Sequence, residues 1–142
     1  MIKTILSIED DRGTQLLNKI YLKESGFCSH MLESWNGHQA LSFFEKLSIG
    51  EEPMENCPQI ILLDINMPLM GGWEFLNHFE SRFPQFATSM PIFILSSSIN
   101  PEDKEKANND PRVMCMLEKP FDFEQIEIAK RILMQFKVED VV

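Results

Sequence analysis

Five short apolar runs recur along the chain, and each is followed by a longer segment in which apolar residues repeat at helical spacing. The predicted strands are Ile2–Ile8, Cys28–Ser34, Gln59–Leu63, Pro91–Leu95 and Arg112–Leu117. The predicted helices are Thr14–Ser25, His38–Leu47, Trp73–Phe83, a polar helix from Pro101, and a last helix that Asp122 caps and that ends near Phe136. Because the strands are apolar throughout rather than alternating, this order predicts a parallel sheet with helices on both faces.

The composition excludes several classes of protein. A chain of 142 residues with 44% apolar and 25% charged residues is predicted to form one globular domain. Its net charge of -9 argues against a nucleic-acid partner. No apolar run approaches the roughly 18 residues of a membrane span, and the N-terminus is too acidic for a signal peptide. Cys28, Cys57 and Cys115 have no CxxC spacing, so we expect free thiols and a cytoplasmic protein.

Polar residues stand at the carboxyl ends of four of the predicted strands. The first strand runs into Glu9-Asp10-Asp11, and the third runs into Asp64, with Asn66 two residues further on. The fourth strand runs into Ser96-Ser97-Ser98, and the fifth into Glu118-Lys119-Pro120. Ligands of open parallel sheets bind beyond the carboxyl ends of the strands, so these residues are predicted to form one site.

The residue types at these ends predict a site for a divalent cation and a phosphoryl group. Converging carboxylates repel one another unless a cation lies among them, and oxygen ligands with room for water suit Mg²⁺. Lys119 adds a positive charge, which indicates that an anion also binds, in contact with Mg²⁺ and the Ser96 hydroxyl. Taken alone, Asp64 fits a turn-capping residue better. Within this site it is the predicted nucleophile, which attacks phosphorus to form an acyl phosphate.

Four stretches together resemble the receiver domain of two-component response regulators, and the resemblance covers essentially the whole chain. They are Glu9-Asp10-Asp11, Asp64-Ile-Asn-Met-Pro-Leu-Met-Gly71, Ser96, and Lys119-Pro120-Phe121. The resemblance implies an α/β fold of the flavodoxin-like, doubly wound (βα)5 type. This fold is a three-layer sandwich around a parallel sheet of strand order 2-1-3-4-5.

The resemblance also implies the roles of the residues around the phosphoryl group. Asp64 would be the phosphoacceptor, and Lys119 and Ser96 would hold the phosphoryl oxygens. Ser98 is a further candidate, for contact with the water that hydrolyses the acyl phosphate. The Lys119–Pro120 peptide bond is expected to be cis, as is usual in the family.

For the metal, the resemblance implies that Mg²⁺ is bound by Asp10, by Asp64 and by the backbone carbonyl of Asn66. Glu9 would act through a bound water. Family members more often have an aspartate at the position of Glu9, so this chain has a longer arm with the same charge. Asp11 is expected to serve mainly as a charge at the start of the first helix.

A conformational switch is expected at Ser96 and Met116. Family members often have an aromatic residue three positions before the lysine, a side chain that moves on activation. This chain has Met116 there. Either a flexible methionine acts as a softer switch, or the usual coupling between the hydroxyl and the aromatic ring is absent.

The resemblance implies a single-domain regulator over residues 1–142, similar to the chemotaxis regulators and without an output domain. Its partners would be a histidine kinase or a histidine phosphotransfer protein, and a downstream protein target. The last helix has one apolar edge that is predicted to face the sheet and a second edge formed by Ile128 and Ile132. That second edge is either a wide core contact or a surface for a partner or a homodimer.

Two other functions stay open at this point. A haloacid-dehalogenase-like phosphatase also uses an aspartate nucleophile, Mg²⁺ and a lysine, but needs a second aspartate where this chain has Asn66. A phosphorylation-independent binding module is the other alternative, and the complete set of acidic residues with Lys119 argues against it. We therefore expect a phosphoacceptor protein, not an enzyme, whose only chemistry is its own phosphorylation and dephosphorylation.

Overall fold

The structure is a computed structural model that describes residues 2–97 and 99–141, with side chains described up to residue 135. The strands are β1 (Ile2–Ile8), β2 (Cys28–Ser34), β3 (Ile60–Asp64), β4 (Ile92–Ser96) and β5 (Cys115–Glu118). The α-helices are α1 (Arg12–Ser25), α2 (Gly37–Ser48), α3 (Gly72–Arg82), α4 (Pro84–Ala87), α5 (Pro101–Asn109) and α6 (Phe123–Val141). A 3-10 turn, η1 (Met54–Asn56), precedes β3.

The five strands form one parallel sheet in the order β2-β1-β3-β4-β5, which confirms the predicted fold. Every residue of β3 and β4 is buried, which explains why these runs are apolar throughout. Ile8 lies in register with Leu63, and Asp64 with Leu95. The carboxyl ends of β1, β3 and β4 therefore meet at one edge of the sheet.

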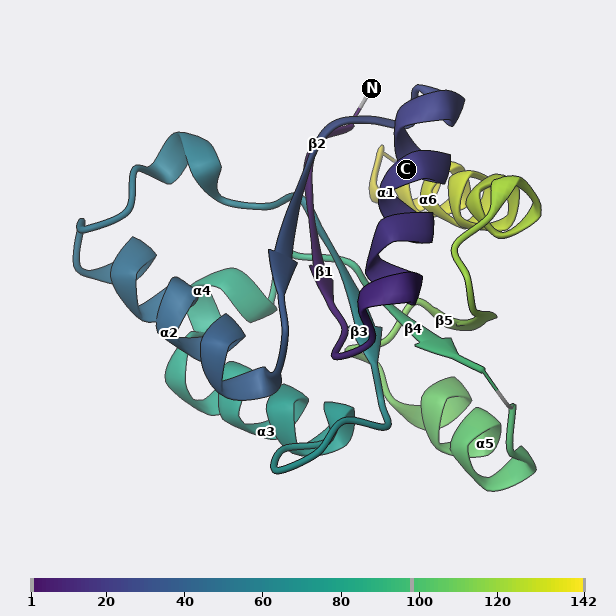
Figure 1. The fold of residues 1–142 in the computed structure, drawn as a ribbon. Coiled ribbons are helices and arrows are strands. Elements are labelled where there is room, and N and C mark those ends of the chain that lie inside the picture. The colour runs from purple at the N-terminus through teal and green to yellow at the C-terminus, as the bar shows by residue number, and fades with distance from the viewer. Residues whose placement is uncertain (1, 98, 142) are drawn as a thin grey trace.

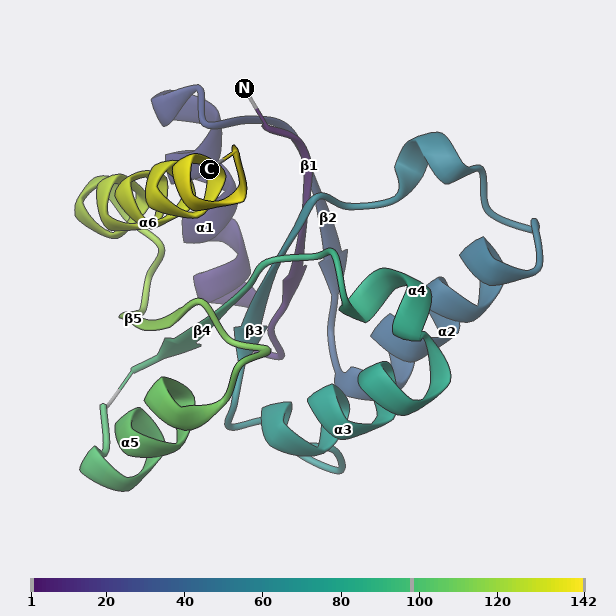
Figure 2. The ribbon, with the colours of Figure 1, turned by 180° about the vertical axis from the view of Figure 1, so that it is seen from behind.

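Helices cover both faces of the sheet (Figure 1). Helices α1 and α6 lie on one face, and α2, α3 and α4 lie on the other, with α5 near β5; Figure 2 shows the same layers from behind. The core on the α2 and α3 side is rich in phenylalanine, with Phe44, Phe75, Phe79 and Phe83 buried together. The core under α1 and α6 is smaller. Among the described residues, no helix has the length and apolar character to cross a membrane.

Local residues set the helix boundaries as the sequence predicts. The Asp11 carboxylate caps α1 by accepting from the backbone N–H of Thr14 at 2.8 Å, which agrees with its expected role at the helix start. Gly26 ends the same helix in the left-handed region, at φ 68°. Asp122 accepts from the backbone N–H of Gln125 at 3.1 Å at the start of α6.

Two predicted boundaries are wrong, and one short helix was not predicted. The fifth strand begins at Cys115 rather than Arg112, because the Arg112 guanidinium binds Asp110 at 2.9 and 2.7 Å and holds a turn before the strand. Helix α4 was not predicted; it starts at Pro84 and buries Phe86 beside the ring of Phe44. Helix α6 continues to Val141, beyond the predicted end near residue 136.

Candidate functional site

Three carboxylates meet at the carboxyl edge of the sheet. Glu9 and Asp10 follow β1, Asp64 ends β3, and one oxygen from each lies within 4.8 Å of the others. Glu9 and Asp64 are each only 2% exposed, whereas Asp10 is exposed. Because β1 and β3 are neighbours in the sheet, the two strand ends bring the predicted acidic residues together.

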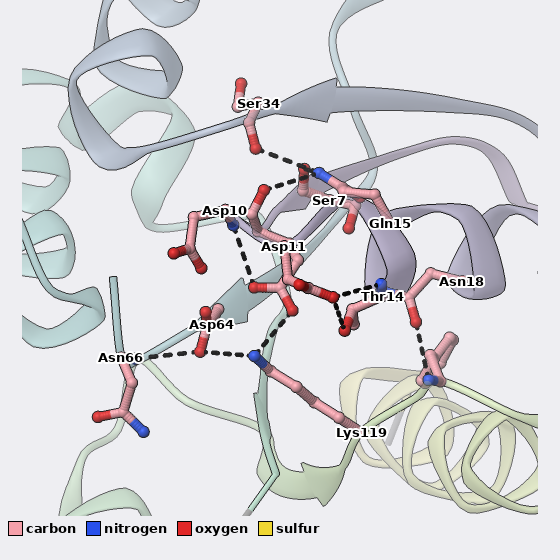
Figure 3. Close-up of polar contacts among 12 residues, drawn as sticks. Ser7, Asp10, Asp11, Thr14, Gln15, Asn18, Ser34, Asp64, Asn66 and Lys119 are labelled. Carbon is pink, nitrogen blue, oxygen red and sulfur yellow. Dashed lines mark hydrogen bonds and ion pairs between the residues drawn. The ribbon is translucent and has the colours of Figure 1, made fainter. Parts of the chain in front are cut away.

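Lys119 reaches this cluster from the end of β5 (Figure 3). Its ammonium nitrogen lies 2.7 Å from Glu9 Oε1 and 3.0 Å from Asp64 Oδ1. Its backbone N–H donates to the carbonyl of Ser96 at 2.9 Å, which fixes the lysine against the end of β4. The Lys119–Pro120 peptide bond is cis, as expected.

Burial and like charge change the proton affinities of the site. Burial first, and then the neighbouring Asp64, raise the pKa of Glu9 to about 8, although Lys119 opposes this. Desolvation and Asp64 also raise the pKa of Asp10. Burial lowers the pKa of Lys119, but its hydrogen bonds with Glu9 and Asp64 outweigh burial and leave it raised. Without a further cation, burial and the charge of Asp64 therefore favour a proton on Glu9, and the Lys119 ammonium 2.7 Å away opposes it.

The donor set of the site fits a divalent cation. Asp64 Oδ1 accepts from the backbone N–H of Asn66 at 3.0 Å and contacts Lys119. Asp64 Oδ2 is buried and has no hydrogen-bond partner among the described residues. An unsatisfied buried carboxylate oxygen is destabilising, and hard oxygen donors are what Mg²⁺ and Mn²⁺ prefer. The acidic cluster is therefore incomplete without a ligand.

Close packing against the end of β3 requires a glycine at position 72. A Cβ atom on Gly72 would lie 2.8 Å from the carbonyl oxygen of Asp64 and 2.8 Å from the Cα of Ile65. The Gly72 N–H also donates to the Ile65 carbonyl at 3.1 Å. This turn folds the start of α3 directly onto the end of β3, so Asp64 is fixed from both sides.

The remaining predicted residues lie at different distances from the cluster. Ser96 is fully buried at the end of β4, the same edge of the sheet, and is joined to Lys119 through its carbonyl. Met116 lies in β5 opposite Ile94 and lines a groove between α5 and α6, so it is not part of the acidic cluster. Ser98 lies outside the residues that the structure describes.

Two buried amides on α1 were missed from the sequence. Gln15 and Asn18 face the interior, and both bond to backbone groups next to site residues. The apolar spacing that predicts α1 comes instead from Leu16, Leu17 and Ile20, which are 58%, 41% and 44% exposed. A signal was present, because positions 15, 18 and 22 share one helix face. Polar residues on that face did not suggest burial.

The comparisons with known proteins agree with this geometry. Residues 5–131 match the family model of the response regulator receiver domain. Response regulator Rcp1 of Synechocystis sp. is 31% identical over 117 residues, which cover 82% of this chain and 76% of Rcp1. A two-component response regulator from Cytophaga hutchinsonii has a TM-score of 0.81 at 26% identity, with 93% of this chain and 97% of that chain covered. The Mn²⁺-bound form of Rcp1 has a TM-score of 0.67 at 26% identity, covering 92% of this chain and 88% of that one.

Receiver domains are phosphoacceptor modules of two-component signalling that bind a divalent metal in an acidic pocket. The cluster of Glu9, Asp10 and Asp64 has the composition of such a pocket. The family match covers most of the chain, and the sheet order is that of the same fold. This protein therefore belongs to the response regulator receiver domain family.

Proposed function

We propose that this protein accepts a phosphoryl group on Asp64 from the phosphohistidine of a histidine kinase or a histidine phosphotransfer protein, in an Mg²⁺-dependent reaction. The observation that carries this proposal is the position of the Asp64 carboxylate and the contacts of its two oxygens. Its carboxylate is held at the end of a fully buried strand, lies 3.0 Å from the Lys119 ammonium, and keeps one oxygen without a hydrogen-bond partner in the described part of the chain. That combination suits a nucleophile, because one oxygen is available to attack while a cation lies beside the other.

In the proposed reaction, an oxygen lone pair of Asp64 forms the new O–P bond. The P–N bond to the donor imidazole breaks, and its electron pair returns to the ring nitrogen. Lys119 is close enough to neutralise charge on the transferred oxygens, since it already contacts the Asp64 carboxylate. Strand β3 and the Gly72 turn hold Asp64 in place, so little reorganisation is needed.

Asp10 and Asp64 would hold Mg²⁺ directly, with the Asn66 carbonyl as a third ligand and Glu9 acting through a water. When bound, the metal would neutralise and orient the phosphoryl oxygens. The Mn²⁺-bound structure of the relative Rcp1 supports a divalent cation at this kind of site. Lys119 contacts two of the same carboxylates, so we expect it to turn from them toward the phosphoryl group.

The outer face of α1 is the proposed docking surface for the phosphodonor. Leu16, Leu17 and Ile20 are exposed there, and Phe123 at the start of α6 is 50% exposed. The ring of Tyr21 contacts that of Phe123, with centroids 5.0 Å apart, so the two helices form one surface. Helix α1 begins directly after the acidic run, so a donor bound along this surface can direct its histidine toward Asp64. Exposed apolar residues that gather in this way mark an interaction site.

The phosphoacceptor is tested with acetyl phosphate, Mg²⁺ and intact-protein mass spectrometry. Wild type is expected to gain one phosphoryl group, and Asp64→Asn is expected to gain none. Asp11→Asn is the matched control, because Asp11 is a nearby carboxylate that only caps α1. Labelling of Asp64→Asn at the wild-type level would show that another residue is the acceptor. Turnover of small phosphate esters, which we do not expect, would favour a phosphatase.

The docking surface is tested by comparing two phosphodonors. Leu16→Glu with Ile20→Glu is expected to slow transfer from a histidine kinase, chosen from a panel from the same genome. The same variant is expected to keep the wild-type rate with acetyl phosphate, since both side chains are exposed on the outer face of α1. Equal loss with both donors would place the defect in the site and not in docking.

We also propose that the groove between α5 and α6 binds the downstream target or a second copy of this chain. It is lined by apolar residues that include Ile99, Met116, Ile128 and Ile132. The stripe of α6 that is predicted to face the sheet does so, with Ile126 and Ala129 buried, while Ile128 and Ile132 are half-buried at the groove. Sedimentation with and without beryllofluoride, on wild type and on Ile128→Glu with Ile132→Glu, tests this. No effect of the analogue on wild-type self-association or target binding would exclude the groove.

A further inference from the structure

The inner face of α1 carries two amide side chains that are almost completely buried. Asn18 is 0% exposed and Gln15 is 1% exposed. A helix that covers a sheet normally places apolar residues there, because a buried amide needs hydrogen-bond partners. Asn18 Oδ1 and Gln15 Nε2 find such partners in the segments that carry the functional residues (Figure 3). Asn18 Nδ2 and Gln15 Oε1 have none among the described residues.

Asn18 holds the segment that carries Lys119. Its Oδ1 accepts from the backbone N–H of Phe121 at 2.8 Å, across 103 positions of sequence. Pro120 has no N–H, so the Phe121 amide is the first backbone donor after the lysine. On the other side, the Lys119 N–H donates to the Ser96 carbonyl at 2.9 Å. The lysine therefore stands between one hydrogen bond to β4 and one to α1.

Gln15 holds the segment that carries the acidic residues. Its Nε2 donates to the carbonyls of Ser7 at 2.9 Å, Glu9 at 3.3 Å and Ser34 at 3.2 Å. These carbonyls lie at the ends of β1 and β2. One side chain thus joins the carboxyl ends of two strands at the residue where the acidic run begins.

We infer that Asn18 is a positioning residue for Lys119, and that Gln15 is the corresponding positioning residue for Glu9 and Asp10. This inference rests on the proposed function, because it assigns the two amides to the two halves of that site. Removing the Asn18 acceptor leaves a buried N–H on Phe121, which the segment relieves by moving toward water. The ammonium of Lys119 moves with it. A displacement of about 1 Å at a reacting group lowers a rate by up to about a hundredfold.

Asn18→Leu is the test variant, and Leu22→Ala is its matched control. Leu22 is buried on the same face of α1 and contributes apolar packing only, so its truncation destabilises the helix without touching the Phe121 amide. If Asn18→Leu does not fold, Asn18→Ser replaces it, because a serine side chain is too short to reach Phe121. Gln15→Leu tests the other half of the site.

The first measurement uses metal-free protein and follows amide hydrogen exchange by NMR. Exchange of the Phe121 amide is expected to accelerate in Asn18→Leu relative to the global exchange of the same protein. In Leu22→Ala, Phe121 is expected to follow the global exchange. If Phe121 keeps its protection in Asn18→Leu, the hydrogen bond does not hold this segment and the inference is wrong.

The second measurement separates metal binding from acylation. For Asn18→Leu we expect Mg²⁺ affinity at the wild-type value, with acylation by acetyl phosphate at saturating Mg²⁺ slowed on the order of tenfold or more. Beryllofluoride affinity is expected to fall in parallel. For Gln15→Leu we expect Mg²⁺ affinity itself to fall. A role in stability alone would give Leu22→Ala the same losses as Asn18→Leu, and that result would overturn the inference.

The two failures can be told apart. If wild type is not acylated at all, the proposed function is wrong, and the exchange of Phe121 in metal-free protein still decides whether Asn18 holds the segment. If wild type is acylated and Asn18→Leu reacts at the same rate, the proposed function stands and the positioning role does not.

Discussion

Replacing Glu9 by glutamine removes one proton-binding group from the site and keeps its shape. In the folded protein the pKa of Glu9 is raised from 4.5 to about 8, chiefly by burial and then by Asp64. The folded state therefore binds this proton more tightly than the unfolded state. The resulting stabilisation is complete below about pH 4.5 and is lost as the pH rises through 8. Metal-free wild type should thus lose stability over this range, and Glu9→Gln should lose less.

The size of the effect follows from the displacement of the pKa. One pKa unit corresponds to about 1.4 kcal/mol, so the Glu9 contribution changes by up to about 1.4 kcal/mol per pH unit. Over the whole interval from 4.5 to about 8, this amounts to roughly 5 kcal/mol at full ionisation. Water entry and movement of Lys119 reduce the penalty, so we expect a difference of about 2–3 kcal/mol between variant and wild type above pH 8.

The assay is urea unfolding in the presence of EDTA, followed by intrinsic fluorescence from about pH 5 to about pH 9. The stability difference between Glu9→Gln and wild type should grow with pH and level off above the Glu9 pKa. Asp11→Asn is the control; hydrogen bonds from Thr14 lower the pKa of Asp11, so its effect should change only at acid pH. Excess Mg²⁺ should flatten the wild-type slope, because a bound cation favours the ionised carboxylate. Parallel curves for Glu9→Gln and wild type across this range would refute the assignment of the buried proton to Glu9.

Three further predictions concern the same edge of the sheet. Asp10→Asn should weaken Mg²⁺ binding about tenfold or more, which a fluorescence titration measures. The same variant should stabilise the metal-free protein by up to about 1 kcal/mol, because it relieves repulsion at this exposed position; thermal unfolding measures this gain. Lys119→Ala should keep or tighten Mg²⁺ binding, since the ammonium contacts the same carboxylates, and should slow acylation about a hundredfold; lost Mg²⁺ affinity with normal acylation would contradict this. Gly72→Ala should cost about 1–3 kcal/mol of unfolding free energy, because its Cβ would lie 2.8 Å from backbone atoms of Asp64 and Ile65; an unchanged urea midpoint would show that the turn can yield.

Most of the fold could be predicted because the patterns that determine it depend on neighbouring residues or on the order of strands and helices. Unbroken apolar runs indicate parallel strands, and parallel strands bring their carboxyl ends to one edge. That reasoning is enough to place Asp10, Asp64 and Lys119 in one site. It could not predict that Lys119 binds Glu9 at 2.7 Å, because ion pairing within a site depends on side-chain distances that spacing does not encode. The late start of β5 could not be predicted for a similar reason. The Arg112–Asp110 ion pair forms a turn in a segment whose composition is that of a strand.

The inner face of α1 shows a second limit. Periodicity locates a helix correctly, but it assigns the buried side by apolar character. In α1 the buried side is determined by hydrogen bonds to backbone groups of other segments. Gln15 donates to three carbonyls, and Asn18 accepts from one N–H. Only the folded arrangement shows that those groups need partners. Because the two amides occupy the buried side, the apolar Leu16 and Ile20 lie on the exposed side of the same helix.

The two sides of α1 are consequently open to different kinds of evolutionary change. On the inward side, Gln15 and Asn18 hydrogen-bond to the segments that carry the site, so substitutions there alter the chemistry of the site or the folding of the protein. Leu16 and Ile20 on the outward side are 58% and 44% exposed, so they can be exchanged with little effect on the sheet or the acidic cluster. If the donor docks on that side, a new pairing between kinase and receiver can arise through a few surface substitutions while the reaction itself is unaltered. A gene duplicate of this protein could thus acquire its own donor before any residue of the phosphorylation site had changed.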